Sequence, residues 1–232
     1  MGYSSLNRVI ARLILLQRIE LANSNLKKIR KIFGRYIFTN FISRIFISVS
    51  EINSKYYSQM NKEYNLLKSY INFDNKKILS IGPGMCGLEL IINDKSSNPI
   101  FTMIEKNYIS KKVIYGWDIE NEEGYNDLKL LKDFITKNGM KNNFEIFDYD
   151  KDNLPLKKFD HIISLYSMDY HYDFSFYIDY IRNVSTENTK IIFDTIRPEY
   201  FKNLFHNVEV IPSEEKKVHS SKRVLCSKFI IW

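Results

Sequence analysis

The sequence predicts an α/β protein with a doubly wound, mostly parallel sheet of seven strands and an N-terminal helical extension. Two patterns carry this prediction. From residue 77 onward, short apolar runs alternate with longer amphipathic runs, as expected when helices connect parallel strands. A glycine-rich turn, Gly82 to Gly87, directly follows the first apolar run. The length of 232 residues, 44% of them apolar, suits one α/β domain with an extension.

Residues 1–74 are predicted to form a basic helical extension. Apolar residues recur at helical spacing between residues 5 and 33, and a second helical pattern covers residues 51–71. Residues 1–50 carry nine Lys or Arg and a single acid, Glu20, which gives this segment a formal charge of +8. The whole chain has a formal charge of +7, so the remaining residues together carry −1. This charge predicts contact with a membrane surface, nucleic acid or an acidic partner, or else the solvated face of ordinary amphipathic helices.

Residues 75–232 are predicted to form the α/β domain. Its seven strand candidates are rich in Ile, Phe and Val: KKILSI, PIFTMIE, FEIF, FDHIISLYS, TKIIFDTI, VEVI and VLCSKFIIW. Two helices are expected between strands, one over residues 126–139 that ends at Gly139 and one over DFSFYIDYIRNV. A polar link without a helical pattern joins the last two strands, so the final strand is expected to run antiparallel to its predecessor.

The glycine turn and two acids predict a nucleotide-type cofactor site. Gly82, Gly84 and Gly87 have the spacing G-x-G-x-x-G, which turns the backbone tightly and leaves main-chain N–H groups open to a ligand. Glu105 ends the second strand, where a carboxylate can accept hydrogen bonds from both ribose hydroxyls. In FEIFDYD, Asp148 can bind an adenine amine, and Tyr149 can offer a ring face. The alternative for the three glycines is a tight turn without a ligand. The alternative for Glu105 is a solvated strand end, and for Asp148 and Tyr149 it is the polar start of a loop.

The acid after the third strand, followed by NLPLKKFDHIISLYS, resembles the class I S-adenosylmethionine-dependent methyltransferases over about residues 75–232. Seven strands with a reversed last strand also resemble that family rather than a dinucleotide dehydrogenase. The resemblance implies S-adenosylmethionine as the cofactor, with the three glycines at its methionine part, Glu105 at its ribose, and Asp148 and Tyr149 at its adenine. Many members carry an acid two positions before the first loop glycine, where it helps hold the methionine amino group. This chain has Ser80 there.

Substrate chemistry is predicted in SMDYHYDF, which follows the fourth strand. Methyl transfer requires the protein to orient the acceptor and, for a hydroxyl, to remove its proton. His171 is the predicted general base because histidine titrates near neutral pH, and Asp169 is its orienting partner or the alternative base. Tyr170 and Tyr172 are candidate substrate contacts. Alternatively, Asp169 or Asp173 caps the next helix and the aromatic side chains fill the groove.

The acceptor is predicted to be a hydroxyl of a small molecule or sugar. Methyltransferases that act on exocyclic amines carry a proline-aromatic motif after the fourth strand, whereas no proline occurs here between Pro155 and Pro198. The Y-H-Y cluster resembles the corresponding segment of bacterial sugar O-methyltransferases, which often has the sequence S-x-x-F-H-Y-P. In this chain Asp173 replaces the proline. Residues of the segment after the second strand could stack on a sugar or anchor that segment to the core: Tyr115, Trp117 and Tyr125.

Asp194 and Arg197 end the fifth strand at the same rim of the sheet. They could bind a polar acceptor or its phosphate, or form a local salt bridge. A divalent-metal site built from Asp169, Asp194 and a further acid is conceivable, but the sequence lacks a His-rich or tightly spaced acidic cluster, so no metal site is predicted.

The sequence therefore predicts S-adenosylmethionine-dependent methyl transfer to a hydroxyl of a small molecule, sugar or glycan precursor. Two alternatives stay open: an RNA-directed methyltransferase, and an inactive methyltransferase-like docking module that uses its basic helices. A nicotinamide-dependent enzyme is least favoured. With only Cys86 and Cys226 and no apolar stretch of membrane-spanning length, the chain is expected to be cytoplasmic, with a peripheral membrane or homodimer contact through the N-terminal helices.

Overall fold

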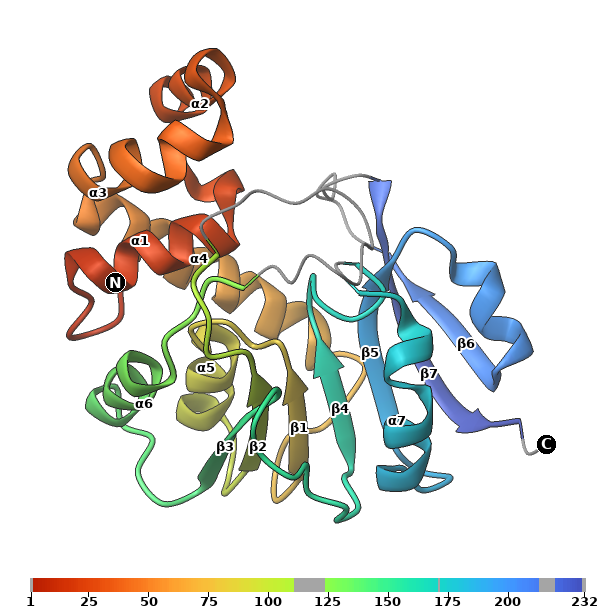
Figure 1. Cartoon of the computed structure of the whole chain (residues 1–232). Helices are drawn as coiled ribbons and strands as arrows, with labels where there is room; N and C mark the ends of the chain where they lie inside the picture. Colours follow the sequence, from red (N-terminus) through yellow and green to blue (C-terminus); the bar gives the residue numbers. More distant parts are fainter. Residues whose placement is uncertain (1, 111–123, 171, 213–219, 231–232) are drawn as a thin grey trace.

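The computed structural model describes residues 2–110, 124–170, 172–212 and 220–230. It contains a seven-stranded sheet with the order β3-β2-β1-β4-β5-β7-β6 (Figure 1). The strands are β1 Lys77–Ile81, β2 Ile100–Glu105, β3 Phe144–Asp148, β4 His161–Ser164, β5 Lys190–Thr195, β6 Phe205–Ile211 and β7 Lys222–Phe229. Strands β1 to β5 are parallel, and β7 runs antiparallel to both β5 and β6. The predicted fold class, including the reversed last strand, is confirmed.

Helices cover both faces of this sheet (Figure 1). Because side chains alternate along a strand, Ile78 packs on one face with α5 Gly87–Lys95 and α6 Leu128–Lys137, and Leu79 packs on the other with α7 Ile178–Val184. Asp127 starts α6 by accepting hydrogen bonds from the N–H groups of Lys129 and Leu130, both at 3.0 Å. Short 3₁₀-helices cover Phe174–Phe176 and Pro198–Asn203.

The N-terminal segment is helical, as predicted. It forms α1 Arg8–Gln17, a 3₁₀-helix Ile19–Leu21, α2 Ser24–Ile37, a π-helix Phe38–Ile42, α3 Ser43–Ile45 and α4 Val49–Leu67. Buried side chains of α1 and α4 belong to the same apolar core as those of α5 and α6. Within the described ranges, no helix is long and apolar enough to cross a membrane.

The strand order reverses between β1 and β4. The chain proceeds from β1 outward to β2 and β3, then returns so that β4 pairs with the other side of β1. Ser80 of β1 is consequently in register with Met103 of β2 and with Ile163 of β4. The connections leaving β1 and β4 diverge at this point, and in open α/β sheets such a divergence creates the crevice in which ligands bind.

Two tyrosines attach the N-terminal segment to the turn that follows β1. The hydroxyl of Tyr56 in α4 accepts a hydrogen bond from the N–H of Gly87 at 3.0 Å, and the hydroxyl of Tyr3 donates to the carbonyl of Gly87 at 2.9 Å. A Cβ at position 87 would lie 2.6 Å from the Tyr56 ring. Glycine is therefore required here for close packing of α4 on α5.

A buried ion network fastens α4 to the far half of the sheet. The guanidinium of Arg223 in β7 donates to both carboxylate oxygens of Asp194 in β5, at 3.2 and 2.9 Å, and also pairs with Glu63 of α4. The side chains of Arg223 and Asp194 are both 0% exposed. The two carboxylates raise the pKa of Arg223 further above its ordinary range, although burial acts in the opposite direction. This arginine remains charged and joins three elements.

Arg223→Met should destabilise the chain strongly. The substitution leaves the buried Asp194 carboxylate without its cation, which typically costs about 3–5 kcal/mol. Lys202→Met is the control because Lys202 pairs with Glu199 at the surface, where ion pairs contribute about 0–1 kcal/mol. Urea unfolding of parent and variants measures both changes. A loss below about 1 kcal/mol for Arg223→Met would contradict the structural role of this network.

Candidate functional site

The glycine turn lies at the carboxyl end of β1 and is held by Glu105. Gly82 and Gly84 both have φ +62°, a left-handed conformation that favours glycine. The N–H of Gly82 donates to the carbonyl of Ile104 at 2.9 Å, and the N–H of Gly84 donates to Oε2 of Glu105 at 2.8 Å. A Cβ at Gly82 would overlap the side chain of Ser167. The turn that follows β1 thus contacts both the end of β2 and the segment after β4.

Glu105 and Asp148 are neighbours at the ends of β2 and β3, where their Cα positions are in register. Burial raises the pKa of the Glu105 carboxyl, while hydrogen bonds from the N–H groups of Lys106 and Gly84 lower it in part. Asp148 is also buried, and its carboxylate accepts a hydrogen bond from the N–H of Asp150 at 3.2 Å. The structure therefore brings together the two acids that the sequence analysis assigned to ribose and adenine.

Lys106 links two aromatic residues that belong to separate sequence motifs. Its ammonium lies 5.4 Å from the ring centroid of Tyr149 and 5.5 Å from that of Tyr172, and it pairs with Asp150 at 3.2 Å. Tyr149 also packs at a tilt against Tyr177, with ring centroids 6.1 Å apart. Sequence analysis did not single out Lys106, although its place directly after Glu105 is the signal that could have identified it.

A hollow beside the glycine turn contains polar groups that lack partners. Arg18, Gly82, Pro83, Glu89 and Leu165 are among its lining residues. Within the described ranges, two lining residues have a buried polar atom without a hydrogen-bond partner, Nη1 of Arg18 and Oε2 of Glu89, and so does Ser80 of β1 at its Oγ. The Arg18 guanidinium is near an acid, with Nη1 3.7 Å from Glu20, but this distance exceeds a hydrogen bond. Buried polar groups are normally satisfied, so this cluster indicates a site for a polar ligand.

Glu89 titrates unusually for a carboxylic acid. Burial is the main influence on its pKa, which rises from 4.5 to about 7, while Ser80 and Arg18 lower it in part. Neither Arg18 nor Glu89 was identified from the sequence. Arg18 lies far outside the glycine motif, and Glu89 stands inside the apolar run LELII at the start of α5, where it resembles a solvated helix position.

The three motif glycines have different roles. Gly84 faces the candidate site, and its carbonyl accepts a hydrogen bond from the side chain of Asn126 at 2.8 Å. A Cβ at Gly84 would lie 2.5 Å from Oε1 of Gln17, which reaches over the turn from α1. Gly87, which the sequence analysis placed beside the cofactor, instead uses its N–H and its carbonyl to bind Tyr56 and Tyr3. These contacts assign Gly87 to packing of the N-terminal helices.

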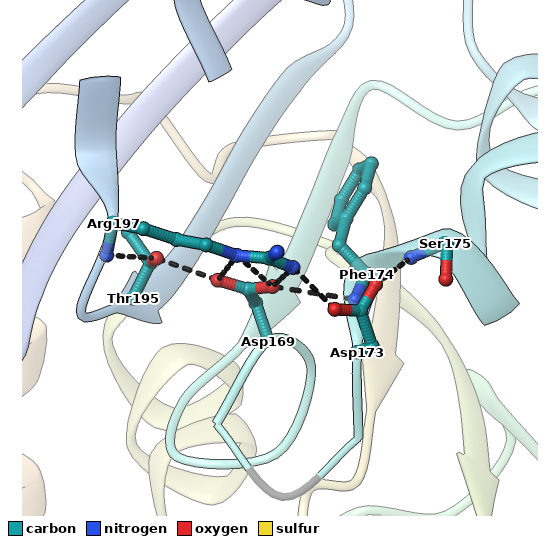
Figure 2. A network of polar contacts seen from close by, with 6 residues as sticks. All are labelled: Asp169, Asp173, Phe174, Ser175, Thr195 and Arg197. Carbon is teal, nitrogen blue, oxygen red and sulfur yellow. Dashed lines mark hydrogen bonds and ion pairs between the residues drawn. The ribbon is translucent and has the colours of Figure 1, made fainter. Parts of the chain in front are cut away.

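A second polar network lies after β4 and β5 (Figure 2). The Arg197 guanidinium binds the buried Asp169 carboxylate, with Nη2 to Oδ1 at 2.5 Å, and also binds Asp173 at 2.7 Å. Asp169 accepts further hydrogen bonds from the hydroxyl of Thr195 at 2.6 Å and from the N–H of Phe174 at 3.3 Å. Because both Asp169 oxygens already accept strong hydrogen bonds, this geometry favours the structural alternative over a role as general base. Asp173 also caps the following 3₁₀-helix through the N–H of Ser175.

The other predicted substrate residues have varied environments. Asp194 is bound by Arg223, as described above, and Arg197 is bound by Asp169 and Asp173, so the alternative of a local salt bridge between Asp194 and Arg197 is not what the structure shows. Tyr170 stacks edge-on with Tyr166 at 5.4 Å, and burial raises its pKa to about 12. The carbonyl of Tyr125 accepts a hydrogen bond from Gln17 at 2.7 Å. Three of the predicted residues lie outside the described ranges: Tyr115, Trp117 and His171. Among the residues that are described, no group of three His, Cys, Asp or Glu could hold a metal ion.

Comparisons with known proteins identify the fold. No protein-family model matches the chain, and no curated protein matches it. A predicted O-methyltransferase from Nostoc punctiforme has a similar structure, with a TM-score of 0.52 and 10% identity over 74% of this chain and 56% of that chain. A Pyrococcus horikoshii protein gives a TM-score of 0.49 and 14% identity over 76% of this chain and 92% of that one.

The 16S rRNA N2 G1207 methyltransferase of T. thermophilus, solved with AdoMet and guanosine, gives a TM-score of 0.48 and 11% identity over 74% of this chain and 42% of that chain. The chain thus spans little more than half the length of the Nostoc protein and less than half that of the rRNA enzyme. The likeness to the Nostoc structure shows that this sheet has the Rossmann-like methyltransferase fold.

Glu89→Gln should remove a pH dependence of stability. The folded chain holds the Glu89 proton more tightly than the unfolded chain does, because its pKa is about 7 rather than 4.5. The parent therefore loses stability as pH rises from about 4.5 to about 7, by on the order of 3 kcal/mol at 1.36 kcal/mol per pKa unit. Glutamine mimics the protonated acid, so the variant should match the parent at low pH and exceed its stability above neutral pH.

Urea unfolding over a range of pH checks this expectation. Glu145→Gln serves as the control because Glu145 forms a half-exposed pair with Lys157, whose loss should change stability by less than about 1 kcal/mol. Parallel pH curves for Glu89→Gln and the parent would show that the pKa of Glu89 does not differ between the folded and the unfolded chain.

Proposed function

We propose that the chain binds S-adenosylmethionine at the carboxyl ends of β1, β2 and β3 and transfers its methyl group to a hydroxyl of a small molecule or sugar. The observation that supports this most is the pair of unsatisfied groups beside the glycine turn. Arg18 can bind a carboxylate, and Glu89 can bind an ammonium when ionised. The methionine end of the cofactor carries both groups on one carbon atom. A dinucleotide pyrophosphate offers no cation for Glu89, and it would add negative charge beside Glu105.

The remaining contacts follow from the strand ends. Glu105 would accept hydrogen bonds from the ribose hydroxyls, in exchange for or in addition to the N–H of Gly84. Asp148 and Tyr149, one strand farther out, would contact adenine. Gln17 lies over Gly84 and donates to the carbonyl of Tyr125, so its side chain is the group that must move to admit a nucleoside.

Glu89 would take the role of the acid that many class I methyltransferases carry at the position of Ser80. Ser80 of β1 lies near Glu89 of α5, and its hydroxyl is among the groups that lower the pKa of the Glu89 carboxyl. An acid on α5 can therefore reach the space that an acid at position 80 would fill. This arrangement supports a functional cofactor site and argues against the inactive docking module.

The bound cofactor would supply an electrophilic methyl group on a sulfonium. The chain's task is then to hold the acceptor in line with that methyl group and to accept its proton. The Arg197 network fixes the side chains of Asp169 and Asp173, which flank His171 in sequence. The absence of a proline-aromatic motif after β4 supports a hydroxyl acceptor, and the Y-H-Y cluster supports a sugar or glycan precursor.

S-adenosylhomocysteine, which has the same zwitterionic end, should bind with micromolar affinity, whereas NAD should not. Arg18→Gln and Glu89→Gln should each weaken binding about 10- to 150-fold, because hydrogen bonds to charged groups contribute roughly 1.5–3 kcal/mol. Arg8→Gln is the control, since Arg8 starts α1, the helix that Arg18 directly follows, but donates to the carbonyl of Ile45. Isothermal titration calorimetry measures all four proteins. Unchanged affinity in both site variants, or tighter binding of NAD, would contradict the proposed cofactor.

His171→Ala should leave S-adenosylhomocysteine affinity unchanged and should lower turnover about 10²- to 10⁴-fold, as expected when a general base is lost. Transfer of a labelled methyl group to a panel of sugars and nucleotide sugars measures turnover. Equal turnover of parent and variant would remove His171 from the mechanism. Transfer to RNA but to none of the hydroxyl acceptors would instead favour an RNA-directed enzyme.

A further inference from the structure

The outermost N-terminal helices expose an unusual set of large apolar side chains. Helix α2, the π-helix and α3 lie at the edge of the molecule that is farthest from β6 (Figure 1). Seven of their side chains, here called the outer apolar surface, are each 40% exposed or more: Ile32, Phe33, Tyr36, Ile37, Phe41, Ile45 and Phe46. Large contiguous apolar exposure is rare on proteins without a partner, so this concentration within fifteen residues requires an explanation.

These side chains face outward although the segment that carries them is firmly attached to the rest of the chain. Its opposite side is already packed, with Leu26, Phe38 and Ile42 in the apolar core. Two arginines of α1 also hold it in place. Arg12 donates to the carbonyl of Thr39 at 3.0 Å, and Arg8 donates to the carbonyl of Ile45 at 2.8 Å. The outward orientation of the apolar residues is therefore fixed by the fold.

The backbone shape helps to gather them. Gly34 has φ +77° and interrupts α2, so the chain changes direction between the pair Ile32 and Phe33 and the residues that follow. Beyond this kink, Ile37, Phe41 and Ile45 follow one another at a spacing of four residues, which places them on one side of the helical segment. Gly34 is exposed, so the kink itself lies at the surface.

The charge of the same segment has one sign. Residues 24–46 contain six basic side chains and no acid: Lys27, Lys28, Arg30, Lys31, Arg35 and Arg44. Lys28 and Lys31 are exposed on α2, next to Ile32. Aromatic and aliphatic side chains on a helical surface with lysine and arginine beside them are the features of segments that lie in the headgroup region of anionic bilayers.

We propose that the outer apolar surface docks on an anionic lipid bilayer, with its apolar side chains between the headgroups and its basic side chains on the lipid phosphates. A second copy of the chain fits less well, because a symmetric contact would bring six positive charges against six. The arrowheads of β1 and β4 point toward the end of the molecule that carries these helices (Figure 1). Docking therefore leaves the candidate site at the membrane-proximal end. The proposal does not depend on the proposed enzymatic function.

Flotation of the full chain with vesicles tests the proposal. The parent should float with phosphatidylcholine vesicles that contain phosphatidylserine and should remain unbound with phosphatidylcholine alone, and added salt should weaken the binding. Lys28→Gln combined with Lys31→Gln should lower the partition coefficient roughly 25-fold, because each basic residue near the surface contributes about fivefold. The matched control is Lys129→Gln with Lys132→Gln, an exposed pair of the same spacing on α6, which should bind like the parent.

A second pair of variants tests the apolar side chains. Phe33→Ser with Phe41→Ser should weaken binding at least about tenfold, since each loses the burial of a phenyl ring. Leu156→Ser with Phe176→Ser is the control, because these side chains are similarly exposed elsewhere, at 69% and 48%. Circular dichroism confirms folding of every variant. The proposal would be overturned if the parent failed to float or if test and control variants lost binding equally. It would also be overturned if the parent did not bind vesicles but self-associated, and Phe33→Ser with Phe41→Ser abolished that self-association.

Discussion

The contact between Tyr56 and Gly87 is the constraint on which the candidate site depends. It places α4 directly on the turn that follows β1, at a position where any side chain larger than hydrogen would collide with the tyrosine ring. Because α1 packs with α4 in the same core, the end of α1 is carried over the glycine turn. Gln17 and Arg18 thus come from the N-terminal segment, and the hollow beside Gly82 would lack its cation without them.

The fold was predictable from the sequence because most strands are local apolar runs rich in Ile, Phe or Val, and the amphipathic runs between them have helical spacing. The seven strands, the glycine turn and the acids at the ends of β2 and β3 all followed from local patterns. The pairing of charged residues that are distant in sequence could not be predicted from such local patterns. Arg223 and Glu63 are 160 positions apart, and Asp169 and Arg197 are 28 apart, so only the folded chain shows which carboxylate each arginine binds. Glu89 is hidden within an apolar run, and Gly87 has the spacing of a ligand contact but a packing role.

The charged groups of the two networks differ from those beside the glycine turn. Arg223 is fully buried and Arg197 is partly exposed, and each is bound by two carboxylates that hold segments of the chain in position. Glu89 is buried and Arg18 is largely buried, yet each retains a buried polar atom without a hydrogen bond in the described part of the chain. This difference in hydrogen bonding distinguishes the two structural networks from the candidate binding site.

A crystal structure of the chain with S-adenosylhomocysteine is the most direct test of the proposal that the N-terminal helices complete a cofactor site. We expect the ligand's carboxylate within hydrogen-bond distance of the Arg18 guanidinium, its amino group on Glu89, its ribose on Glu105, and the Gln17 side chain displaced from Gly84. A ligand bound elsewhere on the sheet, or bound at the glycine turn with Nη1 of Arg18 and Oε2 of Glu89 still without a hydrogen bond, would contradict it.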